Sequence, residues 1–190
     1  MLILLILITF VFSCSPNYNT EEYELRSPSL YFSEYVDGDY LNKAIEIYNA
    51  LSEEVQISEY SIKIYYNGNI EPKFTLNLNS FVLIPDEVYV IGNSSIDKPE
   101  LCNQLSGGIL FNGNDVLELY KGTNLIDSFG KIGEIVEYWN DMNFGTNDCT
   151  LRRKTSVTGG DNDSKNEFIP SYEWISIGYN ILDGLGVREN

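Results

Sequence analysis

The chain has 190 residues, and its 28 Asp and Glu side chains outnumber its 12 Lys and Arg side chains, giving a formal net charge of −16. Proteins bind nucleic acids largely by neutralising phosphates with Lys and Arg, so this charge excludes a nucleic-acid partner. The sequence contains no histidine, which excludes histidine-based acid–base catalysis, nucleophile–histidine pairs and the usual zinc sites.

The chain begins with an apolar run from Met1 to Phe12. The run is too short to span a bilayer but has the length of a signal-peptide core. The residues Val11 to Cys14 resemble the lipobox of bacterial lipoproteins, in which the cysteine becomes a lipidated N-terminus. We therefore predict a signal peptide over residues 1–13 and a lipid anchor on Cys14. The protein would then be exported and held on a membrane of a bacterial cell envelope, at its periplasmic face or at the cell surface. The alternative is a plain secretory signal with an unmodified Cys14.

The next segment reads as a spacer. Residues 15–29 mix Pro, Ser, Asn and Glu without a hydrophobic period, a composition typical of flexible linkers. We predict a lipid-anchored tether over residues 14–29, which lifts the folded part off the membrane. The remaining residues, 30–190, have a length that suits a single domain.

From Leu30 onward, short segments alternate apolar and polar residues and are bounded by Gly, Asn, Asp or Pro. This alternation, together with many β-branched and aromatic residues, is typical of strands. The predicted strands are 30–36, 43–49, 60–66, 87–93, 115–122 and 124–130. Short strands separated by turn signals predict an all-β fold, an antiparallel sandwich or barrel. We interpret the basic run Arg152 to Lys154 as part of an edge strand whose charges discourage pairing with other sheets.

Three clusters, at 36–40, 112–115 and 159–163, combine acidic or amide side chains with glycine. None has the spacing of oxygen ligands, glycine and glutamate that a helix-loop-helix calcium site requires. We interpret the clusters as turns, because Asp and Asn bond their own backbone and tolerate left-handed geometry. The pair Asn67–Gly68 is typical of a tight hairpin turn. Calcium held by irregular loops is the alternative, and no other cofactor is predicted. The candidate calcium ligands are Asp37, Asp39, Asp161 and Asp163.

Two glutamates, Glu34 and Glu46, stand inside predicted strands beside aromatic residues. Neighbouring strands would bring their carboxyl groups close together, and glycosidases work with such a carboxylate pair. The competing interpretation is two solvent-facing carboxylates on a sheet. Both residues are therefore candidates for positions that face a ligand.

Several blocks of the sequence resemble the lamin tail domain family, in its bacterial exported branch. They occur in the family's order and are SEYVDGDYLNKAIEIYN (33–49), YSIKIYYNG (60–68), EVYVIGNSS (87–95), LFNGNDVLELYKGTNLIDSFGKIG (110–133), TLRRKTSVTGG (150–160) and PSYEWISIGYNILDGLG (170–186). The resemblance implies an immunoglobulin-like antiparallel β-sandwich, and it implies no catalytic residues. It does not extend to residues 134–147 or to the cysteines Cys102 and Cys149.

If Cys14 carries lipid, Cys102 and Cys149 are the two thiols left in the chain. Export places them where oxidation is favoured, so we predict a disulfide between them. The alternative is two separate buried thiols that act as small apolar side chains.

These observations together predict a non-enzymatic lipoprotein of the cell envelope. Its single domain would bind or adhere to an extracellular or periplasmic partner, a protein or a carbohydrate. One alternative is a calcium-dependent or carbohydrate-binding module that uses the aromatic surface and the acidic loops. The other is a carboxylate-based hydrolase that uses Glu34 and Glu46.

Overall fold

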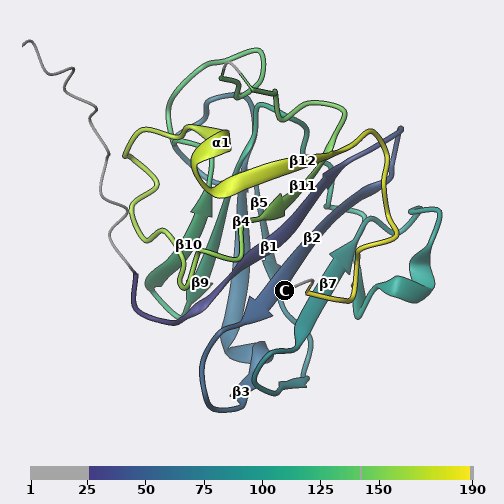
Figure 1. Ribbon diagram of the computed structural model, residues 1–190, viewed down its shortest axis with the longest axis vertical. Helices are drawn as coiled ribbons and strands as arrows, with labels where there is room; N and C mark the ends of the chain where they lie inside the picture. The colour runs from purple at the N-terminus through teal and green to yellow at the C-terminus, as the bar shows by residue number, and fades with distance from the viewer. Residues whose placement is uncertain (1–25, 142, 189–190) are drawn as a thin grey trace, which may run out of the picture.

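The computed structural model describes residues 26–141 and 143–188, and the protein is all-β (Figure 1). Two sheets pack face to face as a sandwich around a shared core. Their strands pair antiparallel, except for the parallel pair β7 and β8. The all-β prediction is therefore confirmed, and the strands of both sheets come from widely separated parts of the chain.

The larger sheet has six strands, in the spatial order β12 (Trp174–Gly178), β11 (Thr150–Arg153), β1 (Leu30–Asp37), β2 (Lys43–Asn49), β7 (Val88–Gly92) and β8 (Gln104–Leu105). The smaller sheet has the order β10 (Asn124–Phe129), β9 (Val116–Lys121), β4 (Tyr60–Tyr65) and β5 (Phe74–Asn77). A short separate ladder joins β3 (Val55–Gln56) to β6 (Val82–Leu83). The helical turns are η1 (Ile57–Glu59), η2 (Pro99–Leu101) and α1 (Pro170–Glu173).

The main core lies between the two sheets, because alternate side chains of each strand point inward. In the six-stranded sheet, the cross-strand neighbours Tyr35, Ile45 and Ile91 are fully buried. Ile62 and Phe129 meet them from the four-stranded sheet, and both are fully buried. The rings of Tyr35 and Phe129 stack with centroids 4.3 Å apart. Aromatic contacts across the interior thus join the sheets.

The six predicted strands are present with small shifts at their ends, as β1, β2, β4, β7, β9 and β10. The predicted turn at Asn67 and Gly68 forms, with φ angles of 54° and 73°. It does not make a tight hairpin, because it lies within a longer loop, residues 66–73, that joins β4 to β5. The cluster at 112–115 is a turn in which the Asp115 N–H donates to the Asn112 carbonyl at 3.1 Å. The Asp115 carboxylate accepts the N–H groups of Asn67 at 2.8 Å and Asn112 at 2.9 Å. It therefore ties two turns together.

The prediction of an edge strand at Arg152 to Lys154 is wrong. Strand β11 lies between β1 and β12, so it pairs on both sides. The Arg153 side chain points into the sandwich and bonds Asp127, whereas Arg152 bonds Glu34 on β1. Cationic side chains are tolerated in this inner strand because each meets a carboxylate.

Residues 179–188, which we call the C-terminal strap, cross the outer face of the six-stranded sheet (Figure 1, yellow). Leu182 and Leu185 on the strap are buried in a second apolar cluster, whose sheet residues include Val36, Ala44 and Val90. Strand β1 is buried along its whole length because the core covers one face and the strap the other. The sheet thus has two covered faces.

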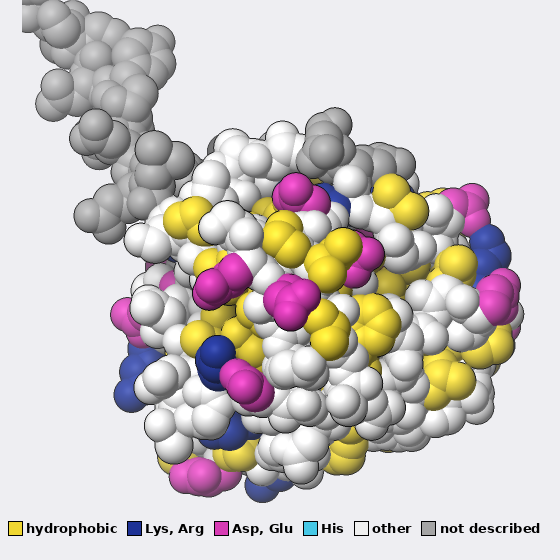
Figure 2. All heavy atoms as spheres, turned by 90° about the horizontal axis from the view of Figure 1, so that it is seen from below, with side chains coloured by type: hydrophobic (Ala, Val, Ile, Leu, Met, Phe, Trp, Pro, Cys, Tyr) yellow, Lys and Arg dark blue, Asp and Glu magenta, His cyan; other side chains and the backbone are white. Residues whose placement is uncertain are grey.

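None of the helices in the described part of the chain has the length and apolar character needed to cross a membrane. Acidic side chains are interspersed with apolar ones over the face of the molecule seen in Figure 2, in keeping with the charge of −16. Carboxylates are thus available on the surface as well as inside.

Candidate functional site

The structure brings Glu34 and Glu46 together as cross-strand partners in β1 and β2. Both side chains are about 1% exposed and point to the outer face of the six-stranded sheet, under the C-terminal strap. Glu34 accepts a hydrogen bond from Arg152 Nε at 2.8 Å, within an ion pair. Glu46 accepts the Ser33 hydroxyl at 2.7 Å and the Gly186 N–H at 2.8 Å. The two carboxylates therefore hold the strap and β11 onto the sheet.

A hollow of about 590 Å³ lies beside these glutamates and is also lined by Arg152, Lys154 and Arg188. Its cations are engaged within the fold. Arg188 Nη1 donates to the Arg153 carbonyl at 2.6 Å, and the Lys154 ammonium donates to the Ser171 carbonyl at 2.6 Å. Burial raises the pKa of Glu46, although hydrogen bonds from Ser33 and Gly186 oppose the shift. The arrangement suits the anchoring of the strap.

Two of the four calcium candidates lie at the end of β1, where Asp37 is the last residue of the strand and Asp39 belongs to the turn that follows. Asp37 forms an ion pair with Lys43 and accepts the Asp148 N–H at 3.1 Å. Asp39 accepts the Tyr179 hydroxyl and, at 3.2 Å, the Asn180 amide. Their carboxylates thus fasten neighbouring segments to the turn, and they do not converge on a common point with the other two candidates.

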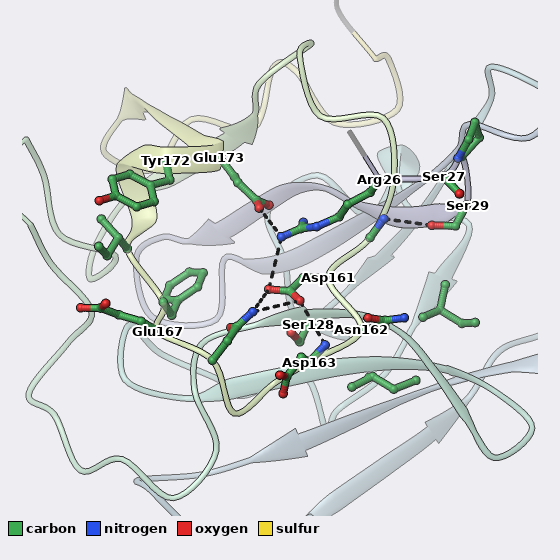
Figure 3. A pocket seen from close by; sticks show the side chains of 17 residues that line it. Arg26, Ser27, Ser29, Ser128, Asp161, Asn162, Asp163, Glu167, Tyr172 and Glu173 are labelled. Carbon is green, nitrogen blue, oxygen red and sulfur yellow. Dashed lines mark hydrogen bonds and ion pairs between the residues drawn. The ribbon is translucent and has the colours of Figure 1, made fainter. Parts of the chain in front are cut away.

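The other two candidates, Asp161 and Asp163, line a hollow of about 640 Å³ that we call the acidic pocket (Figure 3). The acidic pocket lies between the start of the described chain, strand β10 and the loop that leads to α1. Its carboxylates are Asp161, Asp163, Glu167 and Glu173. Its apolar walls include Ile126, Phe168 and Tyr172. Carboxylates and aromatic rings together form a setting that favours a cation.

One cation already enters the acidic pocket. Arg26 Nη2 lies 2.7 Å from Glu173 Oε1 and 3.5 Å from Asp161 Oδ2, as Figure 3 shows. The backbone of the same segment is held as well, since the Thr158 hydroxyl donates to the Arg26 carbonyl at 2.7 Å and the Gly160 N–H donates to the Ser29 hydroxyl at 2.9 Å. Residues 26–29, predicted as the end of the tether, are therefore bonded to the domain.

The wall behind the pocket is a buried ionic cluster. Arg153 and Asp127 form an ion pair with side chains 1% and 0% exposed, and Arg153 also bonds Glu173. Asp127 accepts the N–H groups of Phe32 at 2.7 Å and Asp161 at 2.6 Å. Burial raises the pKa of Asp127, and the Arg153 charge opposes this. The cluster fixes Glu173 and Asp161, the two carboxylates that receive Arg26.

Hydrogen bonds within the loop also fix Asp161 and Asp163. Asp163 N–H donates to Asp161 Oδ1 at 3.0 Å, and Lys165 N–H donates to Asp163 Oδ1 at 3.0 Å. These are the self-bonded turns that the sequence predicted for this cluster. Among the described residues, no group of three or more His, Cys, Asp or Glu side chains is arranged to hold a metal ion. Calcium binding stays a prediction without a defined site.

The predicted disulfide is wrong, because Cys102 and Cys149 are both free thiols in the structure. Cys149 joins the core between the sheets, and its thiol lies 3.3 Å from the Gly145 carbonyl. Cys102 packs against the apolar cluster on the outer face of the six-stranded sheet, close to Gly92. The sheet stands between the two cysteines. The predicted anchor, Cys14, lies outside the described residues.

Sequence reasoning found Asp161 and Asp163 but missed Arg26, Ser128 and Glu173, which complete the pocket. No local signal marks these three residues, because they come from separate segments that only the folded chain brings together. No protein-family model matches the chain, and no curated protein matches its sequence significantly. The resemblance to the lamin tail domain family stays a prediction.

Proposed function

We propose that the chain is a non-enzymatic lipoprotein of a bacterial cell envelope, with a β-sandwich of the lamin tail type that binds a partner outside the cytoplasm. Three features support the proposal. The first residues have the pattern of a lipoprotein signal ending at Cys14, the described residues fold as one all-β body, and that body carries an acidic pocket beside the tether.

The acidic pocket is the observation that carries the binding function. Its volume of about 640 Å³ falls in the range of ligand sites. Two of its carboxylates, Asp163 and Glu167, belong to exposed residues. A partner could therefore reach them without unfolding any strand. The pocket also adjoins residues 26–29, the predicted end of the tether.

We favour the binding function over a carboxylate-based hydrolase, although Glu34 and Glu46 both line a hollow. Such an enzyme needs two carboxyl groups that face an open cleft on either side of a substrate bond. Glu34 is held in an ion pair, Glu46 is hydrogen-bonded by Ser33 and Gly186, and both lie beneath the C-terminal strap. The attachment of the C-terminal strap to the sheet accounts for the burial and the bonds of both carboxylates.

The binding function is tested by crosslinking the tagged full-length chain to its neighbours in living cells and capturing it from solubilised envelopes. The decisive comparison is between the double variant Asp163→Asn with Glu167→Gln and the double variant Glu71→Gln with Glu87→Gln. Both remove two exposed negative charges, but only the first pair lines the pocket. We expect a crosslinked partner with the wild type and the control, and its loss with the pocket variant. Recovery of no partner above an untagged strain would contradict the proposal.

A further inference from the structure

We propose that the acidic pocket recognises the guanidinium or ammonium group of a basic side chain on a protein partner, and that Arg26 of the chain occupies the same position until the partner displaces it. The inference rests on the binding function proposed above and names the chemistry that the site selects. It is built on three observations: the position of Arg26 in the pocket, the unpaired hydroxyl of Ser128 and the apolar walls.

The position of Arg26 in the pocket indicates which chemical group binds there. Its guanidinium reaches the carboxylates of Glu173 and Asp161 in the manner of a bound ligand (Figure 3). Its side chain is still 30% exposed, so it does not fill the pocket. Its Nη1 atom is buried and has no hydrogen-bond partner among the described residues. A buried donor without an acceptor is unfavourable, so Arg26 fits its seat incompletely.

Ser128 provides an independent observation that points to a ligand. This residue of β10 is 5% exposed, and its side chain is one of those that line the acidic pocket (Figure 3). The Ser128 hydroxyl makes no hydrogen bond to any described residue, whereas Ser164 on the loop above donates to Glu118 at 2.6 Å. A hydroxyl that lines a pocket and has no partner in the surrounding fold can bond a group that enters the pocket.

The walls favour a long basic side chain over a small inorganic cation. Ile126, Phe168 and Tyr172 offer apolar surface next to the carboxylates. Lys and Arg carry an aliphatic stem that packs on such surface while the charged head reaches an acid or an aromatic face. The described carboxylates do not form a metal cluster, as noted above. The chain's charge of −16 also attracts a basic partner over a longer range.

Competition with Arg26 has a measurable consequence. If Arg26 must leave the pocket before the partner binds, the apparent affinity for the partner equals the intrinsic affinity multiplied by the fraction of chains in which Arg26 lies outside the pocket. The ion pairs of Arg26 are partly exposed, with side chains 30%, 18% and 15% accessible, so their strength is that of a surface pair. Removing Arg26 should therefore tighten binding by roughly fivefold, the size expected for a surface ion pair.

The test uses the full-length chain and a short fluorescent peptide with one arginine, measured by fluorescence polarisation. The same peptide with citrulline, a neutral isostere, and one with lysine complete the probe set. We expect the arginine and lysine peptides to bind and the citrulline peptide to bind at least tenfold more weakly. Arg26→Gln should bind about fivefold tighter than wild type, and Ser128→Ala and Glu167→Gln should each bind several-fold more weakly.

Glu71→Gln is the matched control, because it removes an exposed charge from a residue that does not line the pocket. Equal weakening by Glu71→Gln and Glu167→Gln would mean that the peptide responds to net charge, and this overturns the inference. Unchanged or weaker binding by Arg26→Gln overturns the competition. Envelope capture that depends on the pocket, with no difference between the arginine and citrulline peptides, would sink the inference and leave the binding function standing.

Discussion

Replacing Arg153 with methionine should destabilise the protein more than any exposed charge substitution. The guanidinium is enclosed between Asp127, at 3.1 Å, and the ring of Trp174, whose centroid lies 4.9 Å away. Methionine retains much of the packing volume but leaves the Asp127 carboxylate charged in a site that is 0% exposed. Removing one partner of a buried ion pair typically costs about 3–5 kcal/mol, against a total stability of roughly 5–15 kcal/mol.

The expected loss can be read by urea denaturation or by thermal unfolding. For a chain of this size, about 3–5 kcal/mol corresponds to a fall in Tm of roughly 6–20 °C. Lys121→Met is the control, because the Lys121–Glu59 pair has side chains 46% and 55% exposed, and such a pair is worth about 0–1 kcal/mol. A loss for Arg153→Met no larger than that of the control would refute the argument from burial.

A double variant separates the charge of Asp127 from its role as an acceptor. Asp127→Leu with Arg153→Met removes both charges, which would be nearly neutral for an isolated buried pair. Here Asp127 also accepts the backbone N–H groups of Phe32 and Asp161. Each abandoned N–H costs about 1–3 kcal/mol, so the double variant should stay roughly 2–6 kcal/mol less stable than wild type. Full recovery of stability would show that the two N–H groups do not depend on Asp127.

Three further predictions concern the anchor, the strap and the thiols. Cys14→Ser should release the protein from membranes or leave it unprocessed, because no acyl chain can be attached; an unchanged membrane fraction would exclude this anchor. Burial raises the folded-state pKa of Glu46, so its contribution to the free energy of unfolding is present below the unfolded-state pKa and is lost as the pH rises through the folded pKa. The stability advantage of wild type over Glu46→Gln should therefore shrink as the pH rises above about 4, and an advantage that grows with pH would contradict the assignment. Burial raises the pKa of Cys102 to about 11 and that of Cys149 to about 12. Both thiols should therefore resist alkylation in the native protein near neutral pH, and both should react once the protein is denatured without reductant. Two cysteines that stay unreactive after denaturation would indicate a disulfide.

The strands that the sequence predicted are those with a clear alternating pattern and a marked turn at each end. Strand β2 occupies the predicted residues 43–49 because Ile45 and Ile47 point to the core and Ala44 and Glu46 point away from it. Strands β5 and β12, which the sequence did not predict, are four and five residues long. Such short stretches have too few residues for alternation to distinguish them from loops.

The register of β1 on β2 explains why the glutamate pair could be predicted in outline but not in role. Strand alternation placed Glu34 and Glu46 in strands, and the register makes them neighbours. Their partners Arg152 and Gly186 lie more than a hundred residues further along the chain, so local sequence holds no sign of them. A carboxylate that is buried and bonded cannot be distinguished by composition from one that faces a ligand.

The acidic pocket was harder to predict than the strands. Some of its carboxylates are held in place by bonds within the fold and others are not, and the sequence does not distinguish the two kinds. Glu173 and Asp161 are held by Arg153, Asp127 and the loop, while Glu167 has no bond to any described residue. Fixed acids resist movement and keep a cation in one place, whereas free acids can follow an approaching ligand. With this many carboxylates in the chain, charge alone cannot mark a site. The pocket stands out because an unpaired hydroxyl and an incompletely bonded arginine line it together with those acids.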